Sequence, residues 1–152
     1  MKWVTRERPR IDRVACAWLI RRFIDPEPEF LFVKNDQVTA VAERENATIF
    51  HVRGGSVGRT PDDTGFEALI RHFKVGEDDP ALQRVANIVH GADVFRADAP
   101  PESAGLRAIM LGWVDVYADD HQILAVGIPV YESLYQWCRR QRPASGTMVV
   151  RT

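Results

Sequence analysis

The chain has 152 residues, of which 45% are hydrophobic and 27% charged, and its formal net charge at pH 7 is −1. This length and composition suit one globular domain with its own core and exclude a disordered chain. Apolar runs are too short to span a bilayer, and residues 1–10 lack the apolar centre of a secretion signal, so we expect a cytoplasmic protein without a membrane partner. Cys16 and Cys138 lie in apolar helical patterns without CxxC spacing, which predicts buried thiols.

Strand and helix patterns alternate over the first fifty residues. Short strands are predicted at 3–5, 30–33 and 48–52, a strongly apolar helix from 9 or 12 to 24, and a weaker helix at 36–44. This βαβαβ order predicts a small, mostly parallel sheet with right-handed crossovers. The loops after such strands are the default place for a ligand. Arg6 lies just after the first strand.

The remaining patterns are helical. Residues 53–64, RGGSVGRTPDDT, form a glycine- and aspartate-rich loop long enough to be functional. Thr64 and Glu67 then form a capping box, and Asp79 is an N-cap before Pro80.

Two further helices are predicted to begin near residues 100–102 and at Asp119 or Asp120, the second kinked or divided by Pro129. We therefore predict an α+β fold, in which a βαβαβ opening with a small parallel sheet is followed by an all-helical second half. It forms a single domain over residues 1–142, with a loosely ordered tail over 143–152 in which 148–150 could add an edge strand.

Positive charge is concentrated in residues 2–25, where seven lysines and arginines face three acidic residues. Arg13, Ala17 and Arg21 share one stripe of the predicted helix, with a methyl group between two guanidinium positions. Guanidinium groups hold oxyanions and carboxylates through bidentate, charge-assisted hydrogen bonds. The predicted oxyanion-binding residues are Arg6, Arg13, Arg21 and, from the loop, Arg59, with Arg10 as an alternative to Arg6. That these arginines are solvated or paired with acidic side chains stays open.

A metal site is the second chemical hypothesis. Asp120 and His121 carry ligand types that suit zinc, iron or manganese, and Asp93 could add a third ligand from a neighbouring helix. An aspartate at a helix start is also an ordinary cap, and this structural interpretation is favoured. The metal hypothesis makes the protein a metal-assisted hydrolase or reductase acting on an anionic substrate. His51 and His72 have no local partner pattern.

Five blocks of sequence, in order, resemble a known family. They are KWVTRERPRIDRVACAWLIRRFIDPEPEFLFV, DPALQRVANIVHGAD, ESAGLRAI, ADDHQIL and YESLYQWCR. Together they resemble the C-terminal domain family of the chromate-resistance protein ChrB, over residues 2–140. Arg6, Arg13, Arg21 and Arg22 match the family's opening block. The family usually has a glycine-histidine pair in the loop where this chain has Gly58 and Arg59, so the resemblance implies an altered site there.

The resemblance implies a chromate-related function. Full-length members resemble transcriptional regulators with an additional N-terminal domain, which we do not find in these residues, so we expect no nucleic-acid partner. The function that we expect is a small cytoplasmic, chromate-type oxyanion-binding protein for sensing or resistance. Its partner is a small oxyanion or an anionic metabolite, and the sequence leaves a homodimer open.

Overall fold

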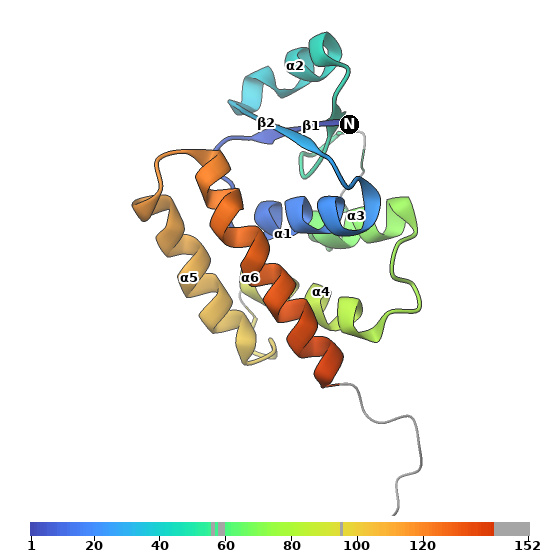
Figure 1. Ribbon diagram of the computed structural model, residues 1–152, viewed down its shortest axis with the longest axis vertical. Helices are drawn as coiled ribbons and strands as arrows, with labels where there is room; N and C mark the ends of the chain where they lie inside the picture. The colour runs from blue at the N-terminus through green and yellow to red at the C-terminus, as the bar shows by residue number, and fades with distance from the viewer. Residues whose placement is uncertain (56, 58–59, 95, 142–152) are drawn as a thin grey trace, which may run out of the picture.

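The computed structural model describes residues 1–55, 57, 60–94 and 96–141 (Figure 1). Arg59 and the tail predicted over residues 143–152, with its edge strand at 148–150, lie outside the described residues. The domain boundary at residue 142 therefore stays a prediction.

The described residues contain one parallel sheet of three short strands, β1 (Lys2–Arg6), β2 (Glu29–Val33) and β3 (Thr48–Ile49). Their order is β2-β1-β3, so the first strand lies in the centre. This confirms the predicted βαβαβ opening. β3 is shorter than predicted because His51, two residues after it, has a φ of 55°, and this left-handed conformation turns the chain out of the sheet.

The apolar helix follows β1 as predicted. α1 (Ile11–Leu19) continues without a break into a π-helix, η1 (Ile20–Ile24), and the helix ends at Asp25 before Pro26. Eight of the nine residues of α1 are buried. The helix lies against one face of the sheet, whereas α2 (Val38–Glu45), preceded by the 3₁₀ turn η2 (Asn35–Gln37), covers the other face (Figure 1).

The second half of the described chain is helical, as predicted. It consists of α3 (Gly65–Phe73), α4 (Pro80–Asp93), α5 (Glu102–Val116) and α6 (Asp120–Arg140). The capping box is confirmed, because Thr64 Oγ1 accepts a hydrogen bond from Glu67 N at 3.2 Å while the Glu67 carboxylate accepts one from Thr64 N at 2.8 Å. Asp79 caps α4, and Asp119 caps α6.

Pro129 does not divide α6, contrary to one of our two expectations. A proline inside a helix leaves the carbonyl four residues earlier, here that of Ala125, without its intrahelical partner. Both Pro129 and Ala125 are exposed, so water can satisfy that carbonyl. The helix is also held from its other side, where it packs on α1.

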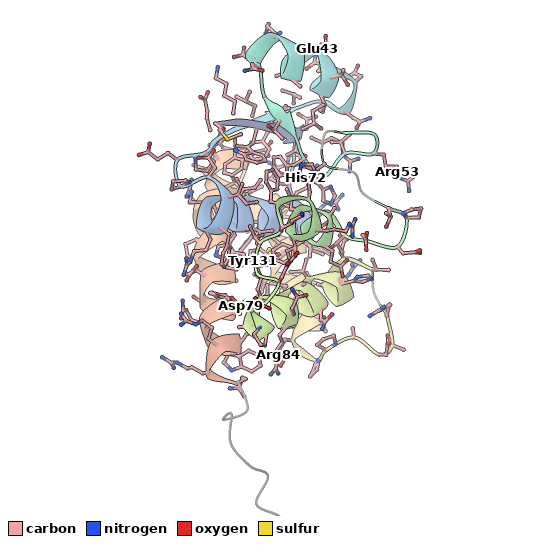
Figure 2. All side chains as sticks on the ribbon, turned by 90° about the vertical axis from the view of Figure 1, so that its right-hand side faces the viewer. Glu43, Arg53, His72, Asp79, Arg84 and Tyr131 are labelled. Atoms are coloured by element: carbon pink, nitrogen blue, oxygen red, sulfur yellow. The ribbon has the colours of Figure 1, made fainter. Side chains whose placement is uncertain are left out.

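The contact between α6 and α1 closes the main core. Tyr131 lies inside the helical half (Figure 2), where its hydroxyl donates a 2.6 Å hydrogen bond to Ile11 O. A Cβ atom at Gly127 would lie 2.4 Å from Val14, so glycine allows the close approach of the two helices. Cys16 and Cys138 are free and buried, as predicted. Within the described residues no helix is both long and apolar enough to cross a membrane.

Candidate functional site

Two pockets open at the carboxyl ends of the three strands, where the strand order predicted a ligand site. The first, which we call the arginine pocket, has a volume of about 280 Å³. The second, which we call the strand-end pocket, has a volume of about 580 Å³. Arg6 at the end of β1 and His51 just after β3 line both pockets. The two pockets are therefore neighbours that share a wall.

Four arginines line the arginine pocket. Arg6 comes from the end of β1, and Arg10 and Arg13 lie three residues apart at the start of α1, a spacing that places side chains side by side on a helix. Arg107 reaches the pocket from α5. The carboxylates that line it are Asp12 and Asp93. Positive groups thus outnumber negative ones around the pocket.

Arg13 is held by the connection between β1 and α1. Its Nη1 donates hydrogen bonds to the carbonyl oxygens of Arg6 at 3.0 Å and Glu7 at 3.1 Å. Burial and repulsion from Arg6 and Arg10 lower the pKa of the Arg13 guanidinium to about 10. The group therefore stays charged at neutral pH, close to two other cations.

Asp12 also lines the arginine pocket and is buried. Its carboxylate accepts hydrogen bonds from Gly65 N at 2.6 Å and Phe66 N at 3.0 Å, at the start of α3. Burial raises the pKa of Asp12, but the contact with His51 and the two backbone donors outweigh it and lower this pKa overall. Asp12 thus joins α1 to the start of α3 and to His51.

His51 stands between the two pockets and is only 8% exposed. Its Nε2 lies 2.5 Å from Asp12 Oδ2, and its Nδ1 has no hydrogen-bond partner within the described part of the chain. A Cβ atom at residue 65 would lie 2.3 Å from the imidazole, so Gly65 is needed for this arrangement. The sequence offered no local pattern for His51, since its partner comes from α1.

Arg107 was also missed by sequence analysis. Its Nη1 donates a 2.7 Å hydrogen bond to Ala92 O, which fixes the side chain beside the end of α4. Arg107 belongs to the ESAGLRAI block, but only the packing of α5 on α4 brings it to the first helix. No spacing in the sequence indicates that contact.

Arg21 lies apart from Arg6 and Arg13. It lines a third pocket of about 320 Å³ with His121 and Phe30. Two helical turns, about 12 Å, separate Arg21 from Arg13 along the axis. Ala17, between them, is completely buried, so the predicted stripe opens on no common groove.

The three candidate metal ligands lie at different places. Asp93 lines the arginine pocket, and Asp120 accepts a 3.1 Å hydrogen bond from Arg8 N. His121 packs edge-on against Phe32, with ring centroids 5.2 Å apart. Among the residues that the structure describes, no group of three His, Cys, Asp or Glu side chains could hold a metal ion.

Arg8 lines neither of the two pockets, and its contacts instead stabilise the fold. Its guanidinium donates to the carbonyl oxygens of Val114, Tyr117 and Ala118, at the end of α5, and it forms an ion pair with Asp120. Its backbone has a φ of 54°. Arg8 thus joins the β1–α1 connection to the α5–α6 turn.

Comparison with known proteins matches residues 3–138 to the family model described as ChrB, C-terminal domain. The chain belongs to this family. It is 34% identical over 134 residues to Protein ChrB of Cupriavidus metallidurans, a match that covers 88% of this chain. The chain spans 40% of the length of that relative. No solved structure matches the chain significantly. Both pockets lie within the match to the ChrB C-terminal domain, and the family resemblance is confirmed.

Proposed function

We propose that this ChrB C-terminal domain binds a small tetrahedral oxyanion of the chromate type in the arginine pocket and acts in chromate sensing or resistance. The observation that carries the proposal is the gathering of Arg6, Arg10, Arg13 and Arg107 around one cavity. Arg6 and Arg13 are carried over from the sequence prediction. Arg21 faces another pocket and is left out.

The arginines have donors to offer a ligand. Within the described residues, the Arg6 guanidinium forms no hydrogen bond or ion pair, and its buried Nε has no partner. Nη1 of Arg13 donates the two hydrogen bonds to Arg6 O and Glu7 O, so its Nε and Nη2 can donate to an anion. A tetrahedral oxyanion would accept hydrogen bonds from several of these guanidinium groups. Its negative charge would also reduce the repulsion between the arginines.

Other parts of the proposal rest on the family and on composition. The chromate link comes from the family resemblance, because the name of the Cupriavidus relative states no ligand. We propose the cytoplasm as the location and neither a membrane nor nucleic acid as partner. The sequence leaves open whether the protein forms a homodimer, and analytical ultracentrifugation tests this.

Isothermal titration with chromate and with sulfate, its redox-inert mimic, tests the site. Arg13→Gln removes one charged fork and should weaken binding by about 1.5–3 kcal/mol, roughly ten- to a hundred-fold. Its stability should change little, because two hydrogen bonds are lost while a repulsion is relieved.

Arg21→Gln is the matched control, since it removes the same group from the same helix outside the pocket. It should bind both anions like the wild type. Equal losses in both variants would favour the predicted stripe over the arginine pocket, and equal binding by all three proteins would refute the proposal.

A further inference from the structure

The strand-end pocket adds a second compartment beside the proposed anion site. Its lining comes from the ends of all three strands and from the start of α2: Arg6, Asn35, Val38, Thr39, His51, Val52 and Arg53. Arg53 projects from the loop after β3 toward solvent (Figure 2). Asn35 and Thr39 are exposed, so a ligand can enter without any rearrangement.

The size of this pocket exceeds the need of a lone tetrahedral ion. Pockets that hold small organic ligands measure about 300–1,000 Å³, and the strand-end pocket falls in this range at about 580 Å³. The arginine pocket, at about 280 Å³, is the smaller of the two. The two neighbouring pockets together therefore suit a ligand in which a small charged group is attached to a larger organic part.

The chemistry of the lining differs between the two pockets. The arginine pocket is dominated by guanidinium groups. The strand-end pocket is also lined by guanidinium groups, those of Arg6 and Arg53, but it adds the amide of Asn35, the hydroxyl of Thr39 and the apolar side chains of Val38 and Val52. An amide and a hydroxyl both donate and accept, which suits the hydroxyl groups of a polar organic molecule.

The shared wall contains buried polar atoms that lack partners. The Nδ1 of His51 and the Nε of Arg6 are buried without a hydrogen-bond partner in the described part of the chain, whereas Nε2 of His51 is engaged by Asp12. Buried polar groups of this kind are normally satisfied, and each one needs an explanation. A ligand atom at the wall between the pockets would supply the missing partner.

We propose that the two pockets together bind a phosphate or sulfate monoester of a small polar alcohol. The oxyanion lies among the arginines, and the alcohol part lies in the strand-end pocket between α2 and the end of β3. This inference rests on the proposed function for the position of the anion. Chromate then occupies the place of the ester's tetrahedral group.

Isothermal titration at pH 8 tests the inference with inorganic phosphate, glycerol 3-phosphate, ribose 5-phosphate and glucose 6-phosphate. Ester phosphates have a second pKa near 6 and are therefore dianionic at this pH, so differences among the esters report the organic part. The wild type should bind at least one ester tenfold or more tightly than inorganic phosphate.

Thr39→Trp fills the strand-end pocket from an exposed position and should fold normally, which thermal melting checks. It should abolish the preference for the ester and leave the affinity for inorganic phosphate within about twofold. Ala40→Trp, at the next exposed position of α2 and outside both pockets, is the control and should keep the preference. Asn35→Trp provides a second filling variant.

The outcomes separate the inference from the proposed function. If phosphate binds but none of the three esters binds more tightly, or if the preference survives both filling variants, the inference is wrong and the anion site stands. If neither phosphate nor any ester binds, the proposed function fails together with the inference.

Discussion

At the scale of single residues, Asp12 connects the most parts of the site. It belongs to α1, accepts two hydrogen bonds from the start of α3, and contacts His51 after β3. The Cys16 thiol also points to it, at 3.7 Å. A carboxylate at the start of α3 is further favoured by the helix dipole. One buried charge thus holds three segments that line or support the pockets.

Asp12→Asn tests this role. Neutralising Asp12 weakens its hydrogen bonds from Gly65 N and Phe66 N and its contact with His51. Hydrogen bonds to a charged group contribute about 1.5–3 kcal/mol each, so urea unfolding at pH 7 should show a clear loss of stability. The pKa of Asp12 is lowered in the folded state, so its contribution is complete above the unfolded value near 4 and is lost as the pH falls through the folded value.

The stability difference between wild type and Asp12→Asn should therefore shrink below about pH 4. Asp36→Asn removes an exposed carboxylate and should unfold like the wild type at pH 7. A difference that persists unchanged down to pH 2 would show that the charge of Asp12 is not what stabilises the fold.

Sequence distance explains which site residues could be predicted. Arg6 and Arg13 flank the single turn between β1 and α1, so local patterns indicated both. Arg21 was grouped with them on helical spacing and on the family's opening block, and neither reveals that Arg13 turns back toward Arg6 O and Glu7 O. His51 and Arg107 reach the pocket only through tertiary packing, and no spacing in the sequence encodes that.

At the scale of elements, helix starts were predicted well because their determinants are local. The capping box at Thr64 and the N-caps Asp79 and Asp119 all form within three residues. The end of β3 depends instead on the left-handed backbone of His51, whose side chain contacts Asp12 of α1 and lies against Gly65 of α3. The sequence therefore indicated where elements begin better than where strands end.

The connection made by Arg8 gives a prediction at this scale. Arg8→Gly removes the hydrogen bonds to three carbonyl groups. Relief of the positive φ offsets the extra conformational entropy of glycine in the unfolded chain, so the net loss of stability reports mainly on the side chain. We expect a loss of about 2 kcal/mol in urea unfolding, because charged hydrogen bonds contribute about 1.5–3 kcal/mol when shielded and less when half-exposed.

Sulfate affinity should stay within about twofold in Arg8→Gly, since Arg8 lines neither of the two pockets. Unchanged stability would mean that the β1–α1 connection is held without Arg8. A loss of sulfate binding in a folded variant would mean that Arg8 acts on the anion site.

At the scale of the whole molecule, the positive charge of the first segment is divided among separate places, and Arg21 and Arg22 are exposed away from the arginine pocket. Arg6, Arg10 and Arg13 surround a cavity, and Arg8 is bound to the end of α5. Tight binding of duplex DNA needs several cations that can each reach a phosphate along the duplex. A concave cluster on a chain of net charge −1 does not provide them.

We therefore predict no sub-micromolar binding of duplex DNA in gel-shift titrations at 50 mM salt. The same titration with sulfate present serves as a control, because a weak complex made only by the arginine pocket should be displaced. Tight binding whose affinity falls steeply with salt, with a slope of several phosphate contacts, would instead favour a direct role in transcription.

The hydrogen bond between Tyr131 and Ile11 has a consequence for the order in which the segments of the domain can fold. It joins residues 120 positions apart, and it belongs to the interface that covers α1. β1, the central strand, likewise needs both later strands. The segments synthesised first are thus buried by the segments synthesised last, and long-range closure of this kind slows folding. During synthesis on the ribosome, the apolar surface of α1 stays exposed until α6 has emerged. Until then, chaperones can bind this surface and it can cause aggregation.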